Sequence, residues 1–203
     1  MTMQNDEINI GENELSPFSP PSAYDAPKED EVAYEDMHPF LRKLIDEHKL
    51  YSDKITDFEE TINLIESGRI DKEIDKRLRN FFKFMDDEVL PHNREEERTV
   101  FPLISKKMNE EGRHSKGGEN FNAIDVLEDE HTKIIQLVAI TFNMFGLFAR
   151  IPDEKSRIII LDVALTQARE LIELLKLHIY REDNTIFTYA NNHLSKEDLD
   201  SLL

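Results

Sequence analysis

Histidine and glutamate recur at one spacing in two distant parts of the chain. Residues 92–101 read HNREEERTVF and residues 178–187 read HIYREDNTIF, so both fit His-x3-Glu-x2-Thr-[Val/Ile]-Phe. Residues four apart lie on the same face of an α-helix, and each copy would therefore present an imidazole beside a carboxylate. Iron, manganese and zinc accept such ligands. The repeat predicts that His92, Glu96, His178 and Glu182 bind metal.

A single histidine precedes each copy, on the apolar seam of what is predicted to be another helix. His48 lies 44 residues before His92, and His131 lies 47 residues before His178. If each pair of helices folds as a hairpin, all of these residues meet at about one level, since a helix rises about 1.5 Å per residue. Four imidazoles and two carboxylates suit two ions, each bound by two histidines and bridged by both glutamates. One histidine on an apolar face is more often a core residue, and it is the recurrence that favours metal.

Other polar residues near the pattern are expected to have ordinary structural roles. Glu47 and Glu130 immediately precede the lone histidines, and a step of one residue turns about 100° around a helix, so they are expected to face water. The remaining expectations are a cap or surface role for His38, solvent exposure for His114 and His193, and core positions for Phe101 and Phe187.

Apolar residues recur at steps of three and four along most of the chain, which predicts amphipathic helices. The expected helices begin at Pro39, near Asp71, after a Gly-rich mobile loop at 109–121, and after the N-cap Asp153; a short last helix is capped by Ser195. Gly68 suits the turn after the first helix, and Pro91 is expected to kink the second. The fold class is therefore all-α, an antiparallel up-down-up-down four-helix bundle over residues 37–203.

Composition limits the remaining possibilities. The 203 residues have a formal net charge of -18 and include no cysteine, which argues against nucleic-acid or membrane-surface partners and against thiolate ligands. Residues 1–36 are acidic and rich in proline, and are expected to form a disordered or loosely docked tail. The N-terminus has no signal-peptide pattern and no apolar run is long enough to span a bilayer, so a cytoplasmic protein is expected.

Ferritin-like bundles use two Glu-x-x-His pairs on helices, and this chain has only one such pair in a predicted helix, Glu128 with His131. The sequence instead resembles the hemerythrin-like, or HHE cation-binding, family. The resemblance covers about residues 38–190 and is carried by DEHK at 46–49, HNREEERTVFP at 92–102, EDEHTK at 128–133 and HIYREDNTIF at 178–187.

This resemblance implies a non-haem centre of two iron ions with an oxo or hydroxo bridge. The implied ligands are His48, His92, Glu96, His131, His178 and Glu182. Oxygen-carrying members have a further histidine one turn from the third-helix ligand, where this chain has Leu127 and Ile135. Members with the reduced ligand set are similar to bacterial stress proteins that respond to NO or O2 or repair iron centres; the family's iron-sulfur repair members also have a cysteine-containing N-terminal domain.

Three hypotheses follow. The first is a di-iron protein that binds or reacts with O2, NO or peroxide, with catalytic turnover left open. The second is an iron or O2/redox sensor that acts through a protein partner. The third is a bundle without metal, in which the histidines belong to the core.

Overall fold

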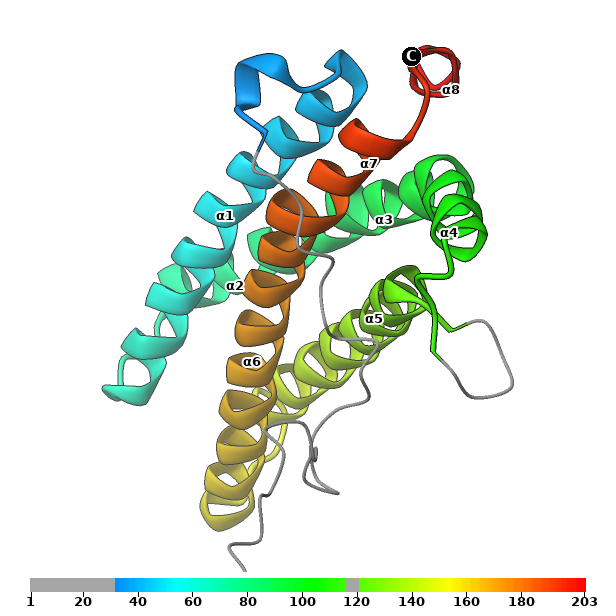
Figure 1. Ribbon diagram of the computed structural model, residues 1–203. Helices are drawn as coiled ribbons and strands as arrows, with labels where there is room; N and C mark the ends of the chain where they lie inside the picture. The colour runs from blue at the N-terminus through cyan, green and yellow to red at the C-terminus, as the bar shows by residue number, and fades with distance from the viewer. Residues whose placement is uncertain (1–31, 116–120) are drawn as a thin grey trace, which may run out of the picture.

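The computed structural model describes residues 32–115 and 121–203, and every regular element in these two ranges is helical (Figure 1). The predicted all-α class is therefore confirmed for the described part of the chain. The elements are η2 (Tyr34–Asp36), α1 (Pro39–Glu66), α2 (Lys72–Phe84), η3 (Met85–Val89), α3 (Leu90–Arg98), α4 (Val100–Glu110), α5 (Ala123–Phe148), α6 (Glu154–Arg181), η4 (Glu182–Ile186), α7 (Phe187–His193) and α8 (Lys196–Asp200).

Side chains at the helix ends explain where the helices begin and stop. His38 caps α1, because its ring accepts a hydrogen bond from the backbone N–H of Phe40. Gly68 follows α1 with a φ of 91°, a conformation that residues with a Cβ rarely adopt. Asp153 accepts from the backbone N–H of Ser156 at the start of α6. These features confirm the predicted cap at His38, the turn at Gly68 and the cap at Asp153.

The second long helical segment is less regular than a single helix. A π-helical turn, η3, stands directly before Pro91, and the backbone N–H of Leu90 bonds to the carbonyl of Met85, five residues back. The sequence predicts a kink at Pro91, and the structure shows this π-helical turn, which ends two residues before it. A second break lies at Thr99, whose φ of -119° and ψ of -81° separate α3 from α4. Another π turn, η4, separates α6 from α7.

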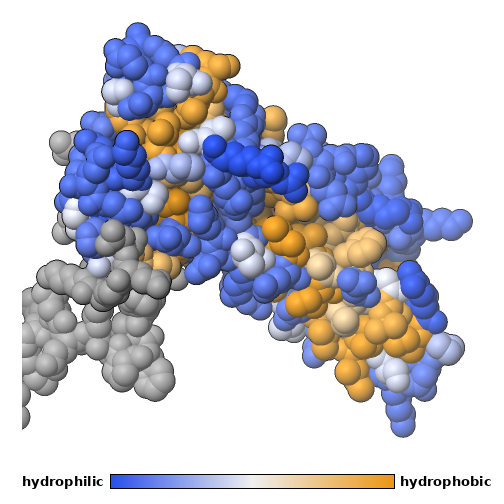
Figure 2. Space-filling model, turned by 90° about the vertical axis from the view of Figure 1, so that its right-hand side faces the viewer, coloured by the Kyte–Doolittle hydropathy of each residue, from blue (hydrophilic) through white to orange (hydrophobic). Residues whose placement is uncertain are grey.

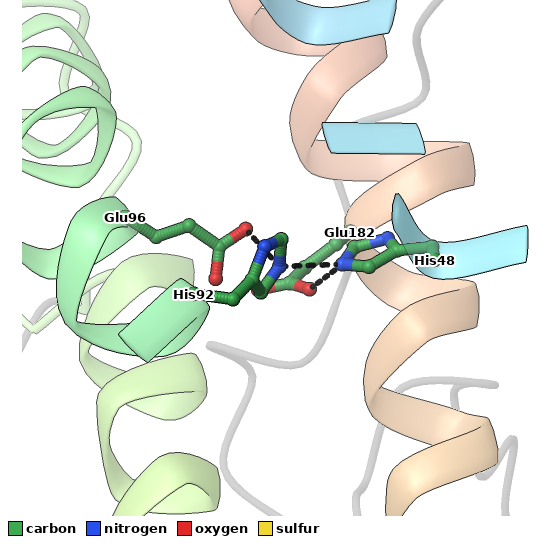
Figure 3. Close-up of side chains that lie close together, drawn as sticks. All are labelled: His48, His92, Glu96 and Glu182. Carbon is green, nitrogen blue, oxygen red and sulfur yellow. Dashed lines mark hydrogen bonds and ion pairs between the residues drawn. The ribbon is translucent and has the colours of Figure 1, made fainter. Parts of the chain in front are cut away.

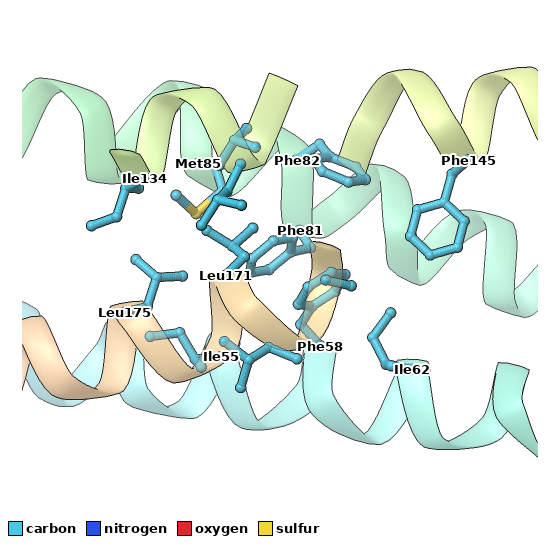
Figure 4. Close-up of a cluster of buried hydrophobic side chains, with 14 of the residues drawn as sticks. Ile55, Phe58, Ile62, Phe81, Phe82, Met85, Ile134, Phe145, Leu171 and Leu175 are labelled. Carbon is cyan, nitrogen blue, oxygen red and sulfur yellow. The ribbon is translucent and has the colours of Figure 1, made fainter. Parts of the chain in front are cut away.

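Two clusters of buried apolar side chains fill the space between the helices. The larger cluster includes Phe58 of α1, Phe81 of α2, Ile134 of α5 and Leu171 of α6 (Figure 4). The rings of Phe58 and Phe81 stack with their centroids 3.7 Å apart and an interplanar angle of 2°. The second cluster is formed by the other end of α1, α4, the start of α5, and the segment from η4 to α8. The predicted ligands lie between these clusters along the chain, so apolar packing on both sides fixes their level.

The packing of the helices follows the chain order only in part. The last long helix returns to the first one: α6 packs against both α5 and α1, and α1 also packs against α2 (Figure 1). The segment after Leu194 adds to this contact: Leu199 of α8 is buried in the second cluster. The short last helix predicted after Ser195 is thus present, and Ser195 caps it.

One face of the molecule shows hydrophobic areas among hydrophilic ones, at the upper left and toward the lower right (Figure 2). An apolar groove of about 260 Å³ lies between the start of α2 and the end of α5, and its lining includes Ile74, Leu78, Phe82 and Phe142. No helix in the described ranges is both long and apolar enough to cross a membrane.

The predicted tail at 1–36 falls mostly on residues 1–31, which lie outside the described residues. Of the remainder, Tyr34 belongs to the short helix η2 and donates a hydrogen bond to Asp46 of α1. Within the predicted loop at 109–121, residues 116–120 lie outside the described part, while α4 extends through Glu110.

Candidate metal centre

The six predicted ligands come together in the interior as two groups that share both glutamates. One group is His48, His92, Glu96 and Glu182, and the other is Glu96, His131, His178 and Glu182. In each group, one ligand atom from every residue lies within 4.8 Å of the others. All six side chains are buried, and the two glutamates are fully buried.

The first group brings together α1, α3 and η4. Nε2 of His48 lies 2.9 Å from Nε2 of His92 and 3.4 Å from Oε2 of Glu182, while Nε2 of His92 lies 3.3 Å from Oε1 of Glu96 (Figure 3). His92 and Glu96 extend from one helix as the i, i+4 spacing predicts. His48 and Glu182 face them from two other elements (Figure 3).

The second group repeats this arrangement with α5 and α6. Nε2 of His131 lies 3.0 Å from Nε2 of His178, and Nε2 of His178 lies 3.2 Å from Oε1 of Glu182. Oε2 of Glu96 lies 3.7 Å from Nε2 of His131, so each glutamate turns one oxygen toward each histidine pair. Two carboxylates placed in this way could bridge two ions.

Behind each histidine lies a further carboxylate, which contacts the Nδ1 atom on the outer side of the ring. The distances from Nδ1 are 2.7 Å for His48 to Asp183, 2.8 Å for His92 to Glu47, 2.8 Å for His131 to Glu97 and 3.0 Å for His178 to Glu130. We refer to these four acidic residues as the outer carboxylates. They orient the rings and fix which nitrogen is protonated, as partners of metal-binding histidines do.

The outer carboxylates correct one prediction. Glu47 and Glu130 were expected to face water, but they contact histidines of the next long helical segment, His92 and His178, and Glu130 is buried. The 100° rotation from the lone histidine directs each of them toward the adjacent helix. Arg181 forms an ion pair with Glu130, and Lys43 lies 3.8 Å from Glu47.

The sequence held a signal for these residues. Each lone histidine follows a glutamate, and each glutamate of the His-x3-Glu pairs is followed by an acidic residue, Glu97 or Asp183. Recurrence, the criterion that identified the six ligands, applies to these four positions as well.

Hydrogen bonding at Nδ1 decides the chemistry of the centre. An ionised carboxylate can only accept, so a neutral histidine carries its proton on Nδ1 and presents the lone pair of Nε2 to the interior. When all four histidines are neutral, as metal binding requires, the Nε2 lone pairs face each other at 2.9 Å and 3.0 Å. The oxygens of Glu96 and Glu182 have no hydrogen-bond partner among the described residues. Buried acceptors without donors are costly, and cations among them would satisfy all eight atoms.

Burial shapes the protonation of the metal-free centre. It raises the pKa of Glu182 well above the usual value, and the charges of Glu96 and Asp183 add to this effect. For Glu96 burial acts in the same direction, but the imidazoles of His92, His48 and His131 together lower its pKa. The two glutamates are therefore unequal, and Glu182 is the one that holds a proton more readily.

The histidines respond to burial as well. It lowers the pKa of His178 to about 4 and that of His131 to about 4, in the second case with help from His178. Burial opposes protonation of His92 too, but Glu96 and Glu47 outweigh it and raise the pKa of His92 to about 9. Neutral imidazole, the form that binds metal, is thus favoured most strongly in the second group.

Aromatic side chains pack against three of the four histidines. Phe101 stacks on His131 with centroids 5.6 Å apart, and Phe187 stacks on His48 at 5.7 Å. Both phenylalanines are fully buried, which confirms their predicted core positions. Tyr51 meets the ring of His92 edge-on at 5.2 Å and 85°.

The other histidines lie apart from the two groups. His38 caps α1 and contacts Asp200 at 3.0 Å. His114 and His193 were expected to be solvent-exposed, but both are half-buried: the former contacts the carbonyl of Ser115 and the latter contacts Glu111 at 3.0 Å. Packing of the chain end against the start of the 109–121 segment explains this difference for His193.

Comparison with known proteins supports the same assignment. The family model described as the hemerythrin HHE cation binding domain matches residues 40–190, which is most of the chain and contains both groups. Searches of curated proteins and of solved structures gave no match to the chain. The match and the buried histidine and glutamate groups agree, and the chain belongs to the hemerythrin HHE cation-binding family.

Proposed function

We propose that this protein holds two iron ions and binds or reacts with O2, NO or peroxide at them. The observation that carries the proposal is the pair of buried four-residue groups that share Glu96 and Glu182. When bound, iron would supply a change between ferrous and ferric states and a coordination position open to a small ligand.

The proposed ligands of one ion are His48 and His92, and those of the other are His131 and His178. Glu96 and Glu182 would bridge both ions, since each has one oxygen toward each pair. Histidine and carboxylate with open positions suit non-haem iron. With two histidines and two shared carboxylates for each ion, the protein leaves part of each coordination sphere free.

The scaffold belongs to the proposal too. Short turns at 67–71 and 149–153 join α1 to α2 and α5 to α6, which supports the antiparallel up-down-up-down four-helix bundle that the sequence predicts. Such a bundle would fix the six ligands from four directions. The apolar clusters on both sides would exclude bulk water, and the outer carboxylates would keep each Nδ1 protonated.

The first experiment measures iron and zinc per chain by elemental analysis, with visible spectra of the air-oxidised protein before and after reduction and exposure to NO. About two irons per chain, the near-ultraviolet absorption of a bridged ferric pair and a spectral change with NO are expected. Zinc in place of iron, or a folded chain that binds no metal, would contradict the proposal. Where Glu96 itself is replaced, Glu95→Gln is the matched control, because Glu95 neighbours Glu96 but contacts Lys43 at the surface.

A second candidate is an iron or redox sensor that acts through a protein partner. It is favoured by the buried oxygens of Glu96 and Glu182, which have no donors among the described residues and destabilise the metal-free centre. Loss of metal would then loosen the contacts between helices and expose a different surface. Limited proteolysis should cut the metal-free form faster, and equal rates for both forms would argue against sensing.

A further inference from the structure

The centre is not symmetric, because a small cavity lies against the histidines on one side. The cavity has a volume of about 10 Å³, close to the space that one water needs. It is bordered by three of the four histidines proposed as ligands, His48, His92 and His178, and by the polar side chains of Tyr51 and Asn93. The rest of its lining is apolar, from Ile55, Phe84, Val89, Leu175 and Ile179.

Asn93 lacks the partner that a buried amide normally has. Its side chain is 5% exposed, and Nδ2 has no hydrogen-bond partner among the described residues. A buried amide without a partner is unfavourable, and most buried polar atoms in folded proteins are hydrogen-bonded. An amide nitrogen can only donate, so the group that would satisfy Asn93 is an acceptor.

Tyr51 offers a second donor on the same cavity. Its ring packs edge-on against His92, and its hydroxyl lies 3.5 Å from the carbonyl oxygen of Glu88, which is at the limit of a hydrogen bond. The hydroxyl is therefore weakly held and can turn to another acceptor.

The corresponding positions of the second hairpin are apolar. Asn93 directly follows His92, whereas Ile179 follows His178; Tyr51 comes three residues after His48, whereas Ile134 comes three after His131. Two hairpins that repeat the same ligand pattern thus differ in the residues beside it. Packing alone does not require the polar pair, since the second hairpin packs with isoleucine at both positions.

We infer that Asn93, assisted by Tyr51, is a specificity-determining residue that donates a hydrogen bond to the outer atom of a small ligand seated beside His48 and His92. The ligand class is a diatomic or similarly small molecule whose outer atom accepts a hydrogen bond, such as NO, O2 or peroxide. The inference rests on the proposed function. Asn93 and Tyr51 are not among the six proposed metal ligands. The cavity beside them has room for about one atom-sized group.

The test uses NO as the probe on the ferrous, iron-loaded protein, with Asn93→Leu compared with wild type. Loss of one hydrogen bond should speed NO release about five- to tenfold. The N–O stretching frequency of the wild-type adduct should shift in D2O, and this shift should be clearly smaller in Asn93→Leu, where only the hydroxyl of Tyr51 can still donate. Tyr51→Phe should change the release rate in the same direction by a smaller factor.

Thr141→Val is the matched control. Thr141 is fully buried and its hydroxyl also lacks a partner among the described residues, but it does not line the cavity. This variant should leave NO release and the N–O frequency unchanged. If Asn93→Leu does not fold, Asn93→Ala removes the same donor without adding bulk.

A readout on the metal-free protein separates this role from a structural one. Because Nδ2 of Asn93 has no partner among the described residues, Asn93→Leu should keep or raise the unfolding temperature, whereas loss of a structural residue would lower it. Iron-loaded Asn93→Leu with wild-type NO release and an unchanged D2O shift would overturn the inference and leave the proposed function intact. A wild-type chain that holds no iron would overturn both.

Discussion

Oδ1 of Asp183 lies 2.7 Å from Nδ1 of His48, although 135 residues separate them. Asp183 directly follows Glu182, which faces the inner side of the same ring at 3.4 Å. Glu97 directly follows Glu96 and stands in the same relationship to His131. In each half of the described chain, two consecutive acidic residues therefore contact opposite nitrogens of the lone histidine from the other half, which ties the two halves together at the centre.

The outer carboxylates should contribute to metal affinity without touching metal. Asp183→Asn and Glu130→Gln remove the charge that orients His48 and His178, and each should weaken iron binding about 10- to 100-fold. Competition with a chelator of known affinity measures this change. Asp129→Asn is the control, because Asp129 neighbours Glu130 but is exposed. Equal affinity in all of these variants would show that the outer hydrogen bonds do not tune the centre.

Glu182→Gln should separate metal binding from stability. The substitution removes a proposed bridge, so the iron content should fall well below that of wild type. In the metal-free protein the same change should stabilise the fold at neutral pH by on the order of a few kcal/mol, because Gln cannot become a buried charge.

The pH dependence of that difference has a definite sign. Burial and the charge of Glu96 raise the folded-state pKa of Glu182 above its ordinary value of 4.5, so the unfolded chain loses this proton first as pH rises. Stability of the metal-free wild type relative to Glu182→Gln should therefore be greatest below pH 4.5 and fall as pH rises through the folded-state pKa. Urea unfolding of both forms between pH 4 and 8 measures it; a constant difference would contradict the raised pKa.

Much of this centre could be predicted from the sequence, because a helix fixes where residues four apart must point. The spacing of His92 and Glu96 sets their common face, and the apolar residues around them require that face to be inside. The role of Glu47 could not be predicted in the same way, because it depends on which neighbouring helix lies 100° around from His48. The π turn at η4 could not be predicted either, because no proline or glycine lies near it in the sequence.

Metal should stabilise the fold strongly. Ions that bind only the folded state add RT ln(1 + [L]/Kd), about 2.7 kcal/mol at a free concentration 100 times the Kd. Removing iron with a chelator should lower the unfolding temperature, and adding ferrous iron back without oxygen should restore it. Differential scanning calorimetry measures both steps. In Glu96→Ala, which lacks a proposed bridge, iron should produce a much smaller shift; an equal shift would place the stabilising ion elsewhere.

The contribution of the apolar core to stability should be separable from metal binding at the centre. Phe58 is buried and stacks on Phe81 two helical turns or more from His48, so Phe58→Ala should cost about 3–5 kcal/mol of unfolding free energy by leaving a cavity. Phe142 is 55% exposed and contacts Phe82 only from the surface, and Phe142→Ala should cost about 1 kcal/mol or less. Denaturant unfolding gives both values, and elemental analysis gives the iron content.

Folded Phe58→Ala should still hold the wild-type amount of iron, because the second apolar cluster continues to support the ligands from the other side. Loss of iron from a folded Phe58→Ala variant would instead mean that the larger cluster itself sets the ligand geometry.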